Sequence, residues 1–198
     1  FLRDLAEKSR ETAQKDWFQL CESAKNHCGI ESVQSWDVAW LSEKLRQENY
    51  SIDKEKLKEY FPVNTVLSGL FSVAKKLFNV GIYQEEGVDL WSKDAQFYRV
   101  CLDEKTIAFF YLDLFARENK RSGAWMGDCR VRRKASDGNI QLPIAFLVCN
   151  FTPPVADRPS LLTFDDVTTL FHEFGHGFHH MLTKSECAPV SGINGVAW

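Results

Sequence analysis

This chain has little surplus charge of either sign and no long hydrophobic segment. Its 24 basic and 27 acidic residues give a net charge of −3, and this balance does not indicate a nucleic acid or an anionic membrane as partner. The longest apolar runs, residues 107–112 and 144–149, are far shorter than the roughly 20 residues of a membrane-spanning helix. The sequence therefore predicts a globular protein with no nucleic-acid, membrane or obligate protein partner.

The six cysteines lack the spacing of a metal site or a disulfide framework. They stand at positions 21, 28, 101, 129, 149 and 187, without a Cys-x2-Cys pair. Reduced thiols are the simplest interpretation, and they are typical of the cytosol or of an organelle matrix. We therefore expect a cytoplasmic protein, with the mitochondrial or plastid matrix as the alternative. A metal or redox role for Cys21 and Cys28 is less favoured, because His27 is the only histidine near them in the sequence.

One short segment does gather metal-binding side chains: residues 172–176 read His-Glu-Phe-Gly-His. On a helix, residues four apart share a face with their Cβ atoms about 5–6 Å apart. The imidazoles of His172 and His176 can therefore reach one Zn²⁺ ion at about 2.0–2.1 Å. Glu173 lies about 100° round the helix, where it can act as general base on zinc-bound water without being a ligand. The competing interpretation is that the histidines are merely core residues whose hydrogen bonds are satisfied within the protein.

The sequence around this motif predicts one helix over residues 163–183. Thr163 is suited to the N-cap, Asp165 and Asp166 suit the first turn, and Pro159 precludes an earlier start. Apolar residues recur at steps of three and four and form one stripe: Val167, Leu170, Phe171, Phe174, Phe178 and Met181. The motif thus falls on a helix, as a zinc site of this kind requires.

Two glycines inside this predicted helix weaken it, since Gly costs about 0.5–1 kcal/mol relative to Ala in a helix interior. Gly175 and Gly177 therefore indicate the close approach of another backbone, of a substrate or of a tightly packed neighbour. His179 and His180 also follow the motif. We expect them to be solvated or core histidines rather than ligands, because His179 lies about 10 Å along the helix axis from His172.

The third zinc ligand is not evident in the chain. A metzincin would carry His at position 182, but Leu182 stands there. A Glu from a later helix is the common alternative. The only carboxylate after the motif is Glu186, which follows the helix too closely. Because the chain also begins without Met and stops at Trp198 with no terminal tail, we expect a fragment of a larger protein, with the third ligand beyond Trp198.

The predicted elements change along the chain. Residues 1–94 read as helical, with helices at 1–25, 36–49 and 53–60 and after Pro62. Residues 95–198 read as a small β-sheet followed by the zinc-binding helix. Two hairpins are expected, 95–101 with 106–115 and 130–134 with 140–150, the second around Asp137-Gly138. The fold class is mainly α with a small β-sheet (α+β). We expect strand 140–151 beside the metal, where an edge strand could bind an extended peptide or simply fill the core.

Several segments together resemble the thimet oligopeptidase family of zinc metallopeptidases, closest to its oligopeptidase A branch. They are residues 110–126, 143–151 and 161–183, with Trp36-Asp-Val-Ala-Trp and Tyr60-Phe-Pro. The resemblance implies a zincin-like, largely helical, two-lobed peptidase with a deep channel that admits short peptides and excludes folded proteins. It maps His172 and His176 to zinc ligands and Glu173 to the base. It also implies that the third ligand and the groups that assist the transition state follow Trp198.

The sequence thus predicts a zinc-dependent endopeptidase that hydrolyses short oligopeptides, in a fragment that is inactive alone. Substrate-binding residues are not predicted. The rival hypothesis is a non-catalytic helical interaction module with structural histidines.

Overall fold

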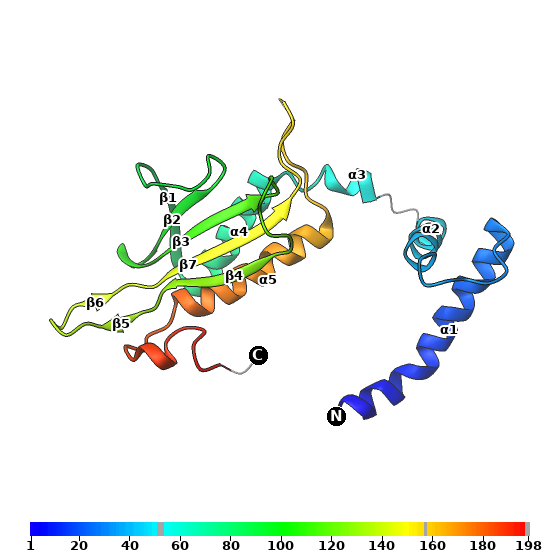
Figure 1. Cartoon of the computed structure of the whole chain (residues 1–198), viewed down its shortest axis with the longest axis horizontal. Coiled ribbons are helices and arrows are strands. Elements are labelled where there is room, and N and C mark those ends of the chain that lie inside the picture. The colour runs from blue at the N-terminus through cyan, green and yellow to red at the C-terminus, as the bar shows by residue number, and fades with distance from the viewer. Residues whose placement is uncertain (51–53, 157, 197–198) are drawn as a thin grey trace. The chain divides into compact units, whose positions relative to one another are not determined.

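The computed structural model describes residues 1–50, 54–156 and 158–196 (Figure 1). The chain forms two compact units, Phe1–Lys54 and Glu55–Trp198. Each unit has a hydrophobic core of its own. The site lies entirely in the second.

The first unit consists of α1 (Leu2–Cys28) and α2 (Val38–Tyr50). Helix α1 ends at Gly29, whose φ of 68° is the left-handed conformation that glycine adopts without steric cost. A small buried cluster of Leu20, Ala24 and Leu41 joins the two helices. The helices expected at 1–25 and 36–49 are confirmed. Of the short helix expected at 53–60, the structure has α3 (Lys54–Lys58), and residue 53 lies outside the described residues.

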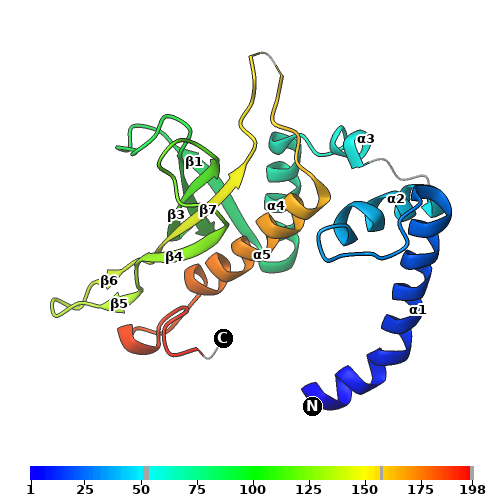
Figure 2. The same cartoon turned by 45° about the vertical axis from the view of Figure 1, so that its right-hand side comes forward.

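The second unit is a five-stranded sheet with two helices on one face (Figure 2). The helices are α4 (Val63–Phe78) and α5 (Phe164–Met181), and a short 3₁₀ helix, η1 (Ala188–Val190), follows. The strand order is β1-β2-β3-β7-β4, with all neighbours antiparallel except the parallel pair β3 and β7. The strands are β1 (Val80–Glu85), β2 (Gln96–Leu102), β3 (Lys105–Phe115), β4 (Trp125–Arg130) and β7 (Ile144–Phe151). Strands β5 (Arg133–Lys134) and β6 (Ile140–Gln141) form a separate two-stranded ribbon.

Alternation along the strands separates the two faces of the sheet. Phe110 and Leu112 of β3, with Leu147 of β7, join the core beneath the helices. Their neighbours Tyr111 and Phe146 stack on each other with centroids 5.3 Å apart, and because successive side chains of a strand point to opposite faces, they lie on the outer face. We call the face of the sheet that carries α4 and α5 the helix face, and we call the opposite face the outer face.

The structure confirms the first expected hairpin, as β2–β3, within a mixed helix and sheet architecture with a small sheet. The second is confirmed only next to its turn, as the two-residue strands β5 and β6, because most of 140–150 belongs to β7 and pairs elsewhere. The structure corrects two expectations. Strand β7, within residues 140–151, is not an edge strand, because it pairs with β3 on one side and β4 on the other. The change from helices to strands comes before residue 95, because β1 begins at Val80. The functional division into residues 1–94 and 95–198 stays a prediction.

Candidate active site

Helix α5 begins where the sequence predicts. The backbone N–H of Asp166 donates to Thr163 Oγ1 at 3.0 Å, and the N–H of Thr163 donates to Asp166 Oδ2 at 2.9 Å. This reciprocal capping box satisfies two backbone donors that the first turn would otherwise leave unpaired. The buried stripe of Leu170, Phe174, Phe178 and Met181 then fixes the rotation of the helix on the sheet. The cap and the stripe together determine where the remaining face of α5 points.

That face presents His172 and His176 side by side. Their Nε2 atoms are 3.0 Å apart, and the two rings are nearly perpendicular, at 89°. Two nitrogen ligands at about 2.0–2.1 Å from a tetrahedral zinc ion lie roughly 3.4 Å from each other. The observed pair is therefore close to the spacing that one ion requires, and imidazole nitrogen is a donor that zinc favours. Among the described residues, no third His, Cys, Asp or Glu joins them in a group that could hold a metal.

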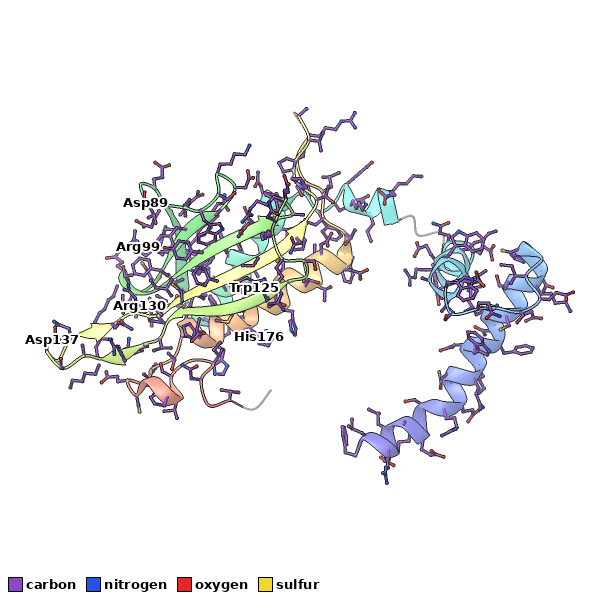
Figure 3. The ribbon with its side chains drawn as sticks, viewed as in Figure 1. Asp89, Arg99, Trp125, Arg130, Asp137 and His176 are labelled. Atoms are coloured by element: carbon purple, nitrogen blue, oxygen red, sulfur yellow. The ribbon has the colours of Figure 1, made fainter. Side chains whose placement is uncertain are left out.

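Glu173 and His176 line a cavity of about 330 Å³ at the edge of the sheet. Figure 3 shows His176 on α5 below Trp125 of β4. The other lining residues come from the start of β4 and from the segment after η1: Ala124, Trp125, Met126 and Ile193. A half-buried carboxylate, an imidazole and a strand backbone thus meet at one opening.

Strand β4 is the sheet edge at this opening. One of its edges pairs with β7, in the register Trp125 with Val148 and Gly127 with Phe146. No strand among the described residues pairs with its other edge. An unpaired strand edge offers N–H and C=O groups to an extended peptide. The geometry therefore combines a pair of imidazoles at about the spacing of two zinc ligands, an adjacent carboxylate and a strand edge that no described strand pairs with.

The sequence profile of peptidase family M3 matches residues 1–198. The chain belongs to peptidase family M3. This confirms the resemblance noted from the sequence, including its oligopeptidase A branch.

Three relatives illustrate the similarity. Oligopeptidase A of Escherichia coli is 48% identical over 199 residues, covering all of this chain and 29% of the relative. An Arabidopsis thaliana organellar oligopeptidase A, chloroplastic/mitochondrial, is 43% identical over 205 residues, covering all of this chain and 26% of the relative. Dipeptidyl carboxypeptidase of E. coli is 35% identical, with 98% of this chain and 28% of the relative covered. The chain thus spans less than a third of the length of these M3 peptidases.

The other histidines of α5 are not with the motif pair. His180 is fully buried, and its Nε2–H donates to the carbonyl of Arg130 at 2.9 Å, which ties α5 to the last residue of β4. His179 is exposed and lines a groove of about 590 Å³ between α4 and α5. Glu186 faces Arg132 at 3.8 Å instead. His179 is thus solvated and His180 is a core histidine, as the sequence predicted. That none of the three residues is a zinc ligand stays a prediction.

The two glycines of α5 have different surroundings. A Cβ added at Gly177 would lie 2.7 Å from Leu147 Cδ2, so this glycine lets α5 approach β7 closely. A Cβ at Gly175 would meet nothing within 4 Å among the described residues. Close packing therefore explains Gly177 but not Gly175.

Cys149 lies in β7 beneath α5 and is fully buried. Burial raises the pKa of its thiol to about 12, and the negative charge of Glu173 adds to the shift. A thiol with this pKa remains protonated at neutral pH and is not a nucleophile. All six cysteines are free, as expected from their spacing.

The sequence did not predict β4 (Trp125–Arg130), nor that Trp125, Met126 and Ile193 line the cavity of Glu173 and His176. The segment 125–130 reads Trp-Met-Gly-Asp-Cys-Arg and has no regular alternation of apolar and polar residues. The turn residues Ser122-Gly123 before it were the one local signal. Segment 188–194 contains Pro189 and Gly192 and has neither helical nor strand periodicity. It therefore carries no local signal that Ile193 would line a cavity with Glu173.

No helix among the described residues is long and apolar enough to cross a membrane.

Proposed function

We propose that this chain carries two zinc ligands, His172 and His176, and the general base, Glu173, of an M3 peptidase that hydrolyses peptide bonds in short oligopeptides. The observation that supports this most strongly is the pair of Nε2 atoms 3.0 Å apart, at the cavity that Glu173 lines with His176. The same three residues satisfy the pattern of a zinc peptidase helix.

The donor set fits one Zn²⁺ ion. When bound, zinc would polarise a carbonyl oxygen and would lower the pKa of a water molecule to about 7. Glu173 takes the proton from the attacking water on a carboxylate oxygen. It then delivers that proton to the nitrogen of the leaving amine, as a single acid–base group does in general catalysis.

Strand β4 orients the substrate. An extended peptide on its free edge donates to and accepts from main-chain groups, which holds the scissile bond near Glu173 without reading much of the peptide sequence. The entropy lost in ordering the peptide is then part of the binding step, so it does not add to the barrier of the chemical step.

The third ligand and the groups that stabilise the oxyanion lie beyond Trp198, in a two-lobed, zincin-like protein. The isolated chain accordingly binds zinc weakly and turns over no peptide. The cytoplasm is the proposed location, with a mitochondrial or plastid matrix as the alternative.

The test uses the full-length protein and its Glu173→Gln variant on an internally quenched peptide. We expect one zinc per wild-type molecule, the same zinc content in the variant, and kcat/KM lower by about 10²–10⁴-fold, which is the usual contribution of a general base. Glu186→Gln is the matched control, because Glu186 is exposed and faces Arg132, and it should retain activity within twofold or so. Full activity in Glu173→Gln, or wild type without zinc, would contradict the proposal and favour structural histidines.

A further inference from the structure

A second cavity lies on the outer face of the sheet, beside the start of β4. It measures about 280 Å³, which suits one side chain or chain terminus rather than a whole ligand. Its walls are Trp91, Trp125, Phe146 and Val148, and its polar lining is Asp113, Arg117, Lys120 and Arg121. Trp125 also lines the cavity of Glu173 and His176. We call this second cavity the Trp91–Trp125 pocket.

Asp113 is the centre of the polar lining. Its side chain is only 3% exposed. Its carboxylate accepts from Arg117 Nη1 and Nη2, both at 2.8 Å, from Lys120 Nζ at 2.8 Å and from Trp91 Nε1 at 2.9 Å. Because four donors already fill this carboxylate, it has little capacity left for a ligand.

The two cations that contact Asp113 differ in what they can still bind. Lys120 donates to Asp113 Oδ1 and to the carbonyls of Asp113 and Phe115, so its three N–H groups are used, and its side chain is 5% exposed. Arg117 is 31% exposed and directs two N–H groups at Asp113. A guanidinium has five N–H groups, so Arg117 retains donors for a second acceptor.

The remaining charges make the pocket cationic. Arg121 is exposed at the rim, and Asp94 lies close enough to Arg117 to affect its pKa. The three cations Arg117, Lys120 and Arg121 therefore outnumber the carboxylates Asp113 and Asp94. An aromatic-walled pocket with a surplus positive charge and a planar guanidinium held in place matches a carboxylate.

The pocket also lies where a bound peptide would end. A peptide that pairs antiparallel with β4 runs from Arg130 towards Trp125, because β4 runs the other way. Its C-terminal part then reaches the start of β4, and alternate side chains point to the outer face. We propose that the Trp91–Trp125 pocket binds a carboxylate of the peptide substrate, with Arg117 as the fixed donor and Arg121 as the donor that closes over the ligand. This inference rests on the proposed peptidase function.

Binding to the full-length Glu173→Gln protein tests the pocket without turnover. Three fluorescent peptides of the same length are compared by anisotropy: one with a free C-terminal carboxylate, one with a C-terminal amide, and the amide with one Glu near its C-terminus. A charge-assisted hydrogen bond at a partly exposed site predicts that a carboxylate peptide binds about tenfold more tightly than the neutral amide. The first and third peptides distinguish a terminal carboxylate from an acidic side chain.

Arg121→Gln, in the same Glu173→Gln background, should reduce the tenfold preference to about threefold or less, because the residual charge of Arg117 remains. Arg130→Gln is the matched control, since Arg130 is exposed at the opposite end of β4, and it should leave the preference unchanged. Equal binding of all three peptides would contradict the proposal that the Trp91–Trp125 pocket binds a carboxylate. A carboxylate preference that Arg121→Gln does not change would contradict it as well.

These outcomes are separable from the proposed chemistry. Hydrolysis by the wild-type protein without any carboxylate preference would overturn the pocket and leave the peptidase function standing. A carboxylate preference in a protein with neither zinc nor hydrolysis would overturn the function instead.

Discussion

The two faces of the sheet are stabilised by different interactions. On the helix face, α4 and α5 cover a continuous apolar core, and the motif residues lie at its margin. On the outer face, aromatic rings line a pocket beside an ion cluster in which Asp113 and Lys120 are buried and Arg117 is partly exposed. The first arrangement orients the motif side chains of α5, and the second holds the loop that leads into β4. The difference indicates that the geometry of the opening depends on residues from both faces.

The loop between β3 and β4 shows this dependence. Residues 116–124 connect the two strands across the end of β7, which lies between them in the sheet. Lys120 anchors the loop to β3, and Asn150 of β7 donates to the carbonyls of Arg121 and Gly123. Trp125 follows directly as the first residue of the edge strand. The outer face therefore determines where that strand begins.

The largest loss of folding stability is expected for a substitution in the ion cluster of the outer face. Asp113→Asn removes the charge that compensates buried Lys120, and breaking such a pair costs about 3–5 kcal/mol. We expect a fall of this size in the free energy of unfolding, measured in urea. Asp89→Asn is the control, because Asp89 is exposed, and it should change stability by less than about 0.5 kcal/mol. Similar stabilities for the two variants would mean that the cluster contributes little.

Acid should weaken the outer face as well. Burial raises the pKa of Asp113, but hydrogen bonds from Arg117, Lys120 and Trp91 outweigh it and lower the pKa from 3.8 to about 2. Because the folded pKa is depressed, the stabilisation is complete above pH 4 and is lost as the pH falls towards 2. A shift of this size corresponds to about 2 kcal/mol.

The measurement compares wild type with Asp113→Asn in urea at pH 5 and at pH 2. The difference in unfolding free energy between the two proteins should shrink by about 2 kcal/mol on acidification. Other carboxylates titrate in both proteins and cancel in the comparison. A difference that stays constant over this range would show that the Asp113 carboxyl is not stabilised in its charged form.

The sequence predicted the helix face better than the outer face, for physical reasons. Helix α5 has a cap, a stripe and a dense motif within about twenty neighbouring residues, so local rules suffice for it. The edge position of β4 depends on the pairing of β3 with β7, which are far apart in the chain, and no local pattern encodes it. Likewise, Trp91 meets Asp113 across 22 positions. Sequence spacing also predicted that His172 and His176 lie side by side on one face of α5, but it did not reveal that Ala124 and Ile193 line the cavity of Glu173 and His176.

The smallest change in stability is expected for Gly177→Ala, which tests how closely α5 packs on the helix face of the sheet. Replacing a helical Gly by Ala gains about 0.5–1 kcal/mol in helix propensity. At Gly177 the new methyl group overlaps Leu147, which is only 1% exposed and has little room to move. Overpacking of this kind costs about 1–3 kcal/mol, so Gly177→Ala should be destabilising by about 1 kcal/mol net.

Gly175→Ala is the matched control, since it lies in the same helix two residues away and meets open space among the described residues. It should stabilise by up to about 1 kcal/mol. Thermal unfolding of the two variants should therefore shift in opposite directions, and the sign rather than the size decides the outcome. If both variants were stabilised equally, α5 could move away from β7 at little cost. The packing of α5 on the sheet would then fix the positions of His172 and His176 less tightly than the ion cluster fixes the start of β4.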